Sequence, residues 1–207
     1  MERLLWHILD ELTPAFEVHA VGPRGSSSRA PGDVSVHEVP ESPLWWFLAR
    51  MKWQAIWLAF KLRPRVVFAG SGLTAPFTWL AARLVGAKAV VYLHGLDIEA
   101  RHGLYRALWL PFIRRCDLVL VNSHFTRSLA RRAGVKCGRI RILHPGVDLP
   151  DYARAAEARR RFRERHALDH RPVMLYVGRI TERKGLAPFV EDILPGVLVG
   201  VADARLV

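Results

Sequence analysis

Short apolar runs alternate with longer stretches of helical period along most of this chain. Runs rich in valine and other aliphatic residues predict strands at 16–21, 34–39, 65–69, 87–93, 118–122, 139–143, 173–177 and 204–207. Apolar residues at every third or fourth position predict helices at 1–12, 43–62, 73–84, 105–115, 123–133, 154–167 and 186–194. Strands that alternate with helices predict an α/β fold with a doubly wound parallel sheet.

The predicted helix 43–62 differs from the others because it carries two apolar stripes on different sides. At about 100° per residue, one stripe is aliphatic and contains Leu44, Leu48, Met51, Ala55, Leu58 and Leu62. The other is aromatic and contains Trp46, Trp53, Trp57 and Phe60, with Arg50, Gln54 and Lys61 at its border. Aromatic rings edged with cations suit the headgroup region of an anionic membrane. We expect that contact through Trp46, Arg50, Trp53, Trp57 and Lys61, although a helix packed between two elements would show the same pattern.

Positive charge is concentrated in the middle third of the chain. The formal net charge is +12, and residues 101–171 hold 17 Lys+Arg against 6 Asp+Glu, a net of +11. Such an excess indicates anionic partners such as nucleotide phosphates, acidic lipid or nucleic acid, although solvated arginine-rich helices would also produce it. The helix 154–165 is basic enough for phosphate contacts, but Phe162 is its one base-stacking residue and no nucleic-acid motif accompanies it. No nucleic-acid partner is therefore expected.

Other classes of site find little support in the sequence. Cys116 and Cys137 form no CxxC pair, and we expect both to be reduced and buried. No paired histidine spacing indicates zinc, so no metal is expected. Residues 1–12 are amphipathic rather than signal-like, and no uncharged apolar stretch approaches the roughly 18 residues of a membrane span. A cytoplasmic location is expected.

The segment Leu175–Gly185 places two cations around a turn between a predicted strand and a predicted helix. Gly178 allows the chain to turn sharply where the strand ends. Arg179 supplies a planar fork of donors and Lys184 a compact positive charge. The N–H groups of the following helix would face the same anion. The segment therefore predicts a diphosphate-binding site, with an ordinary basic loop as the alternative.

A second candidate region joins a glycine-rich turn to a histidine at the end of a strand. Gly70, Ser71 and Gly72 begin a G-x-G-x-x-A pattern, which is typical of dinucleotide binding when an acidic residue ends the next strand. His94 stands at that position instead, and Asp97 follows three residues later. We therefore expect these glycines to line a cleft or to permit a tight turn. Because ligands bind at strand carboxyl ends in open α/β sheets, we expect a functional role for His94 over a structural one.

Four segments in order resemble Glycosyltransferase family 4 of the GT-B fold. They are Tyr92–Asp97, Cys116–Ser123, Gly134–Asp148 and Leu175–Gly185. The helix 1–12 also looks like the first helix of that family, so the resemblance covers nearly the whole chain. It implies two Rossmann-like domains that face a cleft. The expected organisation is an acceptor-side domain at 1–149, a basic linker at 150–171 and the start of a nucleotide-sugar domain at 172–207.

The resemblance also implies a reaction and roles for particular residues. The reaction is transfer of a sugar, with retention and without a metal, from a UDP- or GDP-sugar to a glycolipid or saccharide acceptor. Gly178, Arg179 and Lys184 would bind the donor diphosphate, and the two cations would neutralise the leaving group. His94 would lie beside the donor sugar as a third catalytic residue. The acceptor side of the cleft is expected to contain Gly70, Ser71, Gly72, Gly95 and Asp97.

Two features of the family are missing from the sequence. Its first strand and glycine-rich turn would precede Met1, and its acidic pair for the donor sugar would follow Val207. We therefore expect the chain to be a piece of an enzyme, truncated at both ends and not catalytically competent alone. An inactive remnant or an anion-binding fragment is the alternative. Bacterial surface polysaccharide or glycolipid synthesis, at the inner face of the cell membrane, is the expected setting.

Overall fold

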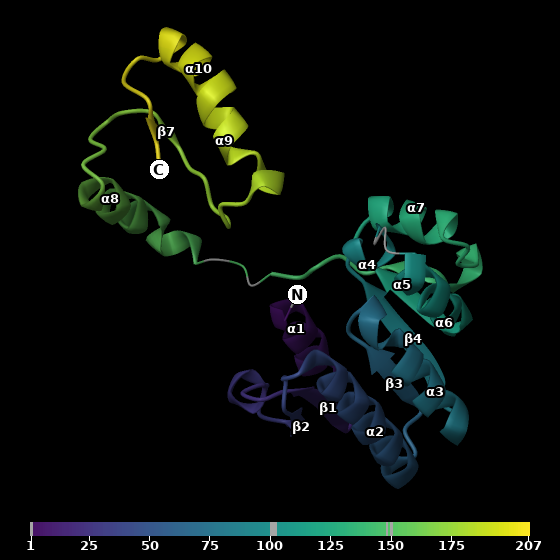
Figure 1. The fold of residues 1–207 in the computed structure, drawn as a ribbon. Coiled ribbons are helices and arrows are strands. Elements are labelled where there is room, and N and C mark those ends of the chain that lie inside the picture. The colour runs from purple at the N-terminus through teal and green to yellow at the C-terminus, as the bar shows by residue number, and fades with distance from the viewer. Residues whose placement is uncertain (1, 100–102, 148, 150) are drawn as a thin grey trace. The chain divides into compact units, whose positions relative to one another are not determined.

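A computed structural model of the protein describes residues 2–99, 103–147, 149 and 151–207. The chain forms two compact units, Met1–Val147 and Asp148–Val207 (Figure 1). Asp148 and Pro150, which belong to the turn expected after His144, lie outside the described residues.

All strand pairs in the described chain are parallel, as the alternating pattern predicts. In the first unit the strands are β1 (Val18–Pro23), β2 (Val34–Val39), β3 (Val66–Ala69), β4 (Lys88–Leu93), β5 (Leu118–Val121) and β6 (Ile140–Ile142). They form a pair, β1-β2, and a separate four-stranded sheet in the order β3-β4-β5-β6. The expected continuous sheet is therefore divided. Periodicity identifies each strand but not its neighbour, because pairing depends on where each crossover connection returns the chain.

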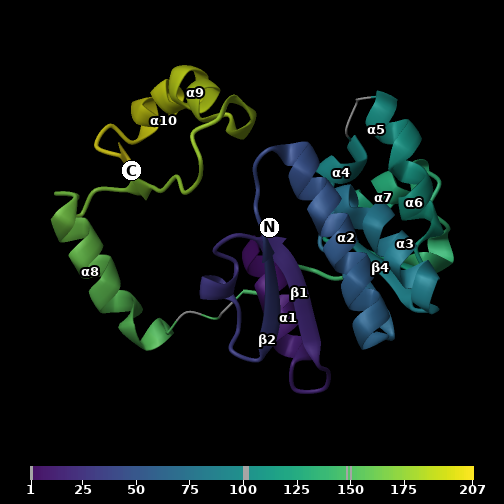
Figure 2. The same ribbon diagram turned by 60° about the horizontal axis from the view of Figure 1, so that its bottom comes forward.

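Seven α-helices are described in the first unit. They are α1 (Glu2–Leu12), α2 (Leu44–Leu62), α3 (Ala75–Val85), α4 (Leu96–Glu99), α5 (Gly103–Leu108), α6 (Leu110–Arg115) and α7 (His124–Arg132). Helix α2 packs against α3, β1 and β2, and Figure 2 shows it between the strand pair and the larger sheet. The predicted cap of α7 is confirmed, because Ser123 Oγ accepts a hydrogen bond from Thr126 N at 3.1 Å.

The expected helix 105–115 is wrong in one respect, because the structure divides it at Trp109 into α5 and α6. Pro111 lies in the first turn of α6. A proline ring clashes with the carbonyl four residues earlier and cannot donate to it, so one continuous helix across this position is disfavoured. At the first turn of a new helix the missing N–H costs nothing.

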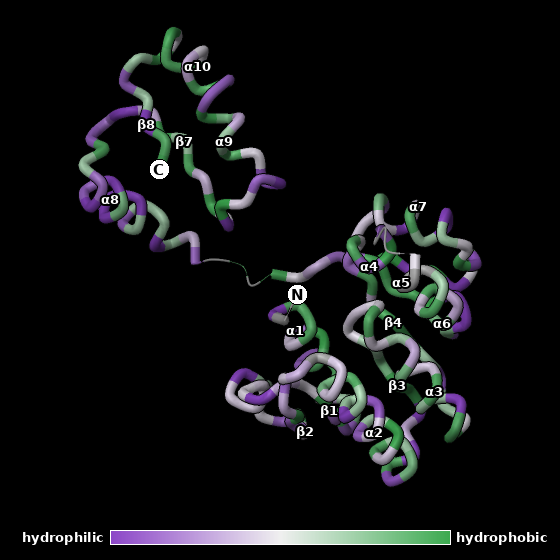
Figure 3. Tube along the Cα trace, in the orientation of Figure 1, coloured by the Kyte–Doolittle hydropathy of each residue, from purple (hydrophilic) through white to green (hydrophobic). Residues whose placement is uncertain are grey.

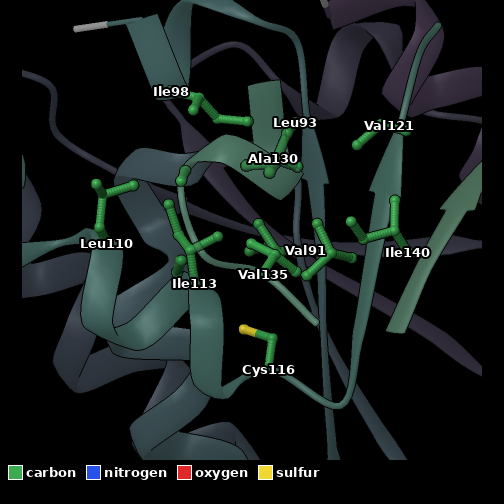
Figure 4. Close-up of a cluster of buried hydrophobic side chains, with 14 of the residues drawn as sticks. Val91, Leu93, Ile98, Leu110, Ile113, Cys116, Val121, Ala130, Val135 and Ile140 are labelled. Carbon is green, nitrogen blue, oxygen red and sulfur yellow. The ribbon is translucent and has the colours of Figure 1, made fainter. Parts of the chain in front are cut away.

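The core of the first unit lies between the four-stranded sheet and its helices. Figure 4 shows Val91, Leu93 and Val121 from adjacent strands with Ile113 and Cys116 beside them, all fully buried. Near-continuous apolar strands are typical of a parallel sheet that is covered on both faces. Burial, and secondarily the Asp117 carboxylate, raise the pKa of the Cys116 thiol to about 12. The expectation that both cysteines are buried is wrong for Cys137, which is exposed.

The Asp117 carboxylate joins the starts of β4 and β5. Its Oδ2 accepts a hydrogen bond from Ala89 N at 3.0 Å, and its Oδ1 lies 3.2 Å from Lys88 Nζ. The Ala89 N–H first, and then Lys88, lower the pKa of Asp117. Because the folded pKa lies below the unfolded one, the stabilisation is present above the unfolded pKa and is lost as the pH falls through the folded pKa.

Asp117→Asn is therefore expected to lower the free energy of unfolding at neutral pH, because the charge that faces Lys88 and the Ala89 N–H is lost. The loss should be only about 1 kcal/mol, because the carboxylate is partly exposed to solvent. The measurement is urea unfolding at neutral pH and at a pH below the lowered pKa of Asp117 in the folded chain. The difference between the two proteins should disappear at the acidic pH. The exposed Asp203→Asn serves as the control. An equal loss in both variants would contradict the assigned role.

The second unit holds a basic helix, a short parallel strand pair and a helical run. Its elements are α8 (Ala155–Arg165), β7 (Val173–Met174), α9 (Leu186–Pro188), a π-helical segment (Phe189–Ile193), α10 (Leu194–Gly200) and β8 (Arg205–Leu206). Strand β7 is shorter than the predicted 173–177, although Tyr176 N still donates to Val207 O at 2.8 Å. With a single neighbouring strand, Leu175 and Val177 remain exposed. The helical run extends past the predicted end at 194, and α8 belongs to this unit.

Hydropathy distinguishes the helices of the two units. In Figure 3, α8 is largely hydrophilic, whereas α2 and α3 alternate between hydrophobic and hydrophilic positions. Within the part of the chain that the structure describes, no helix is long and apolar enough to cross a membrane.

Candidate functional site

The carboxyl end of the four-stranded sheet brings residues from three neighbouring strands together. Gly70 follows β3, His94 follows β4 and Asn122 follows β5. In open α/β sheets the ligand site lies at this edge. The hydrogen bonds among these three residues therefore define the first part of the candidate site.

His94 is held by contacts to its ring and to its backbone. Its Nε2 lies 2.9 Å from Gly70 O, and its backbone N donates to Asp97 Oδ2 at 2.9 Å. A carbonyl oxygen can only accept, so Nε2 carries the proton in this bond. In the neutral ring, Nδ1 is then the nitrogen with the free lone pair. The half-buried imidazole also packs beside Tyr92, with ring centroids 4.9 Å apart.

Gly95 is the turn residue that separates β4 from α4. Its φ is +99°, a conformation that side chains other than glycine rarely adopt. An added Cβ would also lie 3.3 Å from Thr126 Oγ1. Gly95 O accepts from Ile98 N at 3.0 Å, so the turn fixes α4 and the Asp97 side chain together.

Gly95→Ala is expected to lower the free energy of unfolding by about 2 kcal/mol, from backbone strain and from the contact with Thr126. Gly86→Ala is the matched control, because Gly86 has a φ of +74° and nothing within 4 Å of an added Cβ. The control should lose only about 1 kcal/mol in urea unfolding. Equal losses would show that the contact with Thr126 contributes nothing.

Asn122 is a part of the site that the sequence did not reveal. Its Oδ1 accepts from Thr126 Oγ1 at 2.6 Å and from Ser123 Oγ at 3.2 Å. Its Nδ2 lies 3.5 Å from His94 O, and its backbone O lies 3.1 Å from His144 Nδ1. Asn122 therefore links the ends of β4, β5 and β6. The signal that could have identified it is its position as the last residue of a predicted strand.

The glycine-rich turn after β3 is explained by packing within the chain. An added Cβ at Gly70 would lie 2.6 Å from Leu5 Cδ1, a side chain of α1. Gly72 is buried in a single 3-10 turn, and Ser71 precedes that turn with extended backbone. In a dinucleotide fingerprint the glycines allow a pyrophosphate to approach the backbone. Here the leucine side chain makes the close approach, which supports the tight-turn interpretation.

The second part of the candidate site is the segment after β7. Gly178 and Arg179 are exposed, and Tyr176 Oη donates to Arg179 O at 3.1 Å. Lys184 ends a 3-10 turn, and Gly185, at a φ of +68°, leads into α9. Among the described residues, neither the Arg179 nor the Lys184 side chain makes a hydrogen bond or an ion pair. Both cations are therefore available to an anion.

The predicted site residues thus form two groups, one in each unit. The sheet edge of the first unit brings together Gly70, His94, Gly95 and Asp97, with Ser71 and Gly72 in the adjoining turn. The second unit holds Gly178, Arg179 and Lys184 on one strand-to-helix connection. Within the described chain, no group of three or more histidine, cysteine or acidic side chains could hold a metal ion.

The basic helix α8 shows little that would recognise a base. Phe162 packs against His166, with ring centroids 4.6 Å apart. Arg163 Nε donates to Asp169 O at 2.7 Å, and Arg160 pairs with Glu164 at 2.8 Å. The aromatic ring and part of the charge on this helix are therefore used within the unit.

Sequence comparison places the first unit in a known family. The model of "Glycosyltransferase Family 4" matches residues 1–150. An alpha-D-kanosaminyltransferase from Streptomyces kanamyceticus is 30% identical over 134 residues, which cover 59% of this chain and 35% of that protein. A GDP-mannose-dependent alpha-(1-6)-phosphatidylinositol monomannoside mannosyltransferase from Mycolicibacterium smegmatis is 34% identical over 144 residues, which cover 65% of this chain and 36% of that protein.

Structural comparison agrees on the fold. Alr3699/HepE from Anabaena, in a crystal structure with UDP and glucose, matches with a TM-score of 0.73 and 13% identity. The match covers 99% of this chain and 56% of that one, and it shows the Rossmann-like α/β fold of GT-B type. The chain spans about a third of the length of the two curated relatives. On the family match over residues 1–150, the chain belongs to Glycosyltransferase Family 4.

Proposed function

We propose that this chain supplies the acceptor-side domain and the donor-diphosphate segment of a retaining glycosyltransferase. The reaction would move a sugar from a UDP- or GDP-sugar to a lipid-linked or saccharide acceptor. The observation that carries the proposal is the sheet edge with His94, Gly95 and Asn122, which lies inside the residues matched by the family.

The proposed role of the second unit is to bind the donor diphosphate. Breaking the bond between the sugar and the diphosphate leaves negative charge on the leaving group, and positioned cations stabilise that charge most in the transition state. Arg179 and Lys184 are exposed, and Gly178 lies beside Arg179 at the turn. Both cations precede the start of a helical run, where N–H groups favour an anion. No metal is needed for this role.

His94, Gly95 and Asp97 are proposed to contact the sugars on the side of the first unit, with Gly70, Ser71 and Gly72 in the adjoining turn. The bond to Gly70 O leaves Nδ1 of His94 as a hydrogen-bond acceptor for a sugar hydroxyl. The two curated relatives are named as a kanosaminyl and a mannosyl transferase, which supports sugar transfer as the reaction class.

The names of similar proteins support the proposed donor and acceptor classes. One relative is named as GDP-mannose-dependent, and the Anabaena structure contains UDP. We therefore propose a nucleoside diphosphate sugar as the donor. The mycobacterial relative is named for a phosphatidylinositol monomannoside, which supports a glycolipid acceptor. The proposed location is the inner face of the cell membrane. Surface polysaccharide or glycolipid synthesis is the proposed pathway.

The test uses a full-length enzyme that contains this chain and a panel of radiolabelled UDP-sugars and GDP-sugars. It measures the release of UDP or GDP from each of these donors. Bacterial lipid extract and free saccharides serve as acceptors. Label is expected to appear in one acceptor class, with the anomeric configuration of the donor. The 207-residue chain alone is expected to show no turnover. Absence of transfer from every nucleotide sugar, together with absence of saturable UDP and GDP binding, would overturn the proposal.

A further inference from the structure

The outer side of helix α2 is aromatic along most of its length. Trp46, Trp53, Trp57 and Phe60 are 41%, 66%, 52% and 47% exposed. Their spacing of seven, four and three residues places them within one narrow arc at about 100° per residue. These four residues are called the aromatic face of α2. Trp45, 68% exposed, extends the aromatic surface at the start of the helix.

The opposite side of α2 already has its packing partners. Leu58 and Ala59 are buried, and the helix packs against α3, β1 and β2. The outward side of such a surface helix is ordinarily polar. Helix α2 is thus packed between α3 and the β1-β2 pair, and its aromatic face still remains exposed in the described first unit. An exposed aromatic face of this kind marks an interaction site.

Cations accompany the aromatic rings of α2. Arg50 lies over the Trp46 ring at 5.0 Å, Lys61 over the Trp57 ring at 5.0 Å, and Lys52 over the Trp53 ring at 5.5 Å. The 19 residues of the helix contain these three cations and no Asp or Glu. The partner of this face must therefore accept aromatic rings and carry negative charge.

We infer that the aromatic face of α2 binds the surface of an anionic phospholipid bilayer, with the helix lying in the plane of the headgroups. Tryptophan is favoured at the headgroup level because its ring is amphipathic. Arginine and lysine beside the rings would pair with lipid phosphates while their alkyl stems stay in the apolar layer. This inference goes beyond the proposed function, because it depends on no step of sugar transfer.

The test is co-sedimentation of the full chain with vesicles of phosphatidylcholine alone and of equal parts phosphatidylcholine and phosphatidylglycerol. Binding is expected to the anionic vesicles and to fall with added salt. The double variant Trp53→Ser and Trp57→Ser is expected to weaken binding at least about tenfold. Phe125→Ser is the matched control, because Phe125 is 62% exposed on α7, outside the aromatic face, and should leave binding unchanged.

A second pair of variants separates this face from the general basicity of the chain. Arg50→Gln with Lys61→Gln is expected to weaken binding to anionic vesicles roughly tenfold. Arg131→Gln with Arg132→Gln removes the same charge from exposed positions of α7 and should have little effect. Equal losses from both pairs, or absence of binding to anionic vesicles by the unchanged chain, would overturn the inference.

Two further readouts keep these results interpretable. Urea unfolding should give the same midpoint for the variants as for the unchanged chain, because the substituted side chains are on the surface. Light scattering should show a monomer whose mass is independent of concentration. A dimer that Trp53→Ser and Trp57→Ser dissociate would show that the face binds a second copy of the chain, and this would also overturn the membrane inference.

Discussion

Arg179→Ala is expected to reduce the rate of sugar transfer about a thousandfold in a full-length enzyme that contains this chain, because one stabilising donor to the leaving group is lost. The exposed guanidinium makes no bond to another described side chain, so its removal should leave the fold intact. Kinetics with saturating acceptor would measure the loss in kcat, and isothermal titration would measure the loss in UDP or GDP affinity. Arg179→Lys keeps the charge but not the planar fork, and should recover only part of the rate.

The matched control for this prediction is Arg183→Ala. Arg183 is also exposed and carries the same charge, and it lies in the 3-10 turn next to Lys184. A small effect of Arg183→Ala beside a large effect of Arg179→Ala would assign the diphosphate to a specific position. Normal turnover in Arg179→Ala would show that the segment is an ordinary basic loop after a strand.

Strands and helices were predictable where one hydrophobic pattern runs through the whole segment. Strand β4 is apolar over most of its length because the sheet is covered on both faces, and its predicted end at Leu93 is the observed one. Pro111 was visible in the sequence, but apolar spacing continues across it, so periodicity alone predicted one helix. The exposure of Cys137 was missed because residue type describes an average environment.

The candidate site was predictable only in part, because its contacts cross between strands. His94 could be identified from its position at a strand end, which is a property of a single segment. Asn122 bonds to His94 O and to Thr126, and those contacts depend on the order of β4 and β5 in the sheet. Gly70 likewise resembled part of a ligand fingerprint, because the sequence does not show that Leu5 fills the adjacent space.

For the aromatic stripe of α2, the sequence predicted which residues share a face but not whether that face is exposed. The 3.6-residue period fixes which side chains share a face, so the positions of Trp46, Trp53 and Trp57 followed from the sequence. Their exposure did not follow, because two apolar faces are equally compatible with burial between two elements. The structure adds that Leu58 and Ala59 occupy the buried side, and this leaves the rings outward.

In a full-length enzyme that contains this chain, His94→Gln is expected to reduce kcat/KM about a hundredfold while leaving the free energy of unfolding almost unchanged. The glutamine amide nitrogen can take the place of Nε2 and donate to Gly70 O, so the one observed bond of the ring would be kept. The position of Nδ1 is left empty in this variant. If the sugar hydroxyl binds there, turnover is lost without loss of stability.

His94→Asn is the complementary variant, because its amide can occupy the Nδ1 position but cannot reach Gly70 O. Its amide oxygen can accept from a hydroxyl, so this variant should lose about 1 kcal/mol of unfolding free energy and recover part of the turnover. The opposite order, with full turnover in His94→Gln and little in His94→Asn, would show that the ring acts only through Gly70. His94 would then be a structural residue that holds the ends of β3 and β4 together, and the contact to the sugar would have to come from elsewhere on the sheet edge.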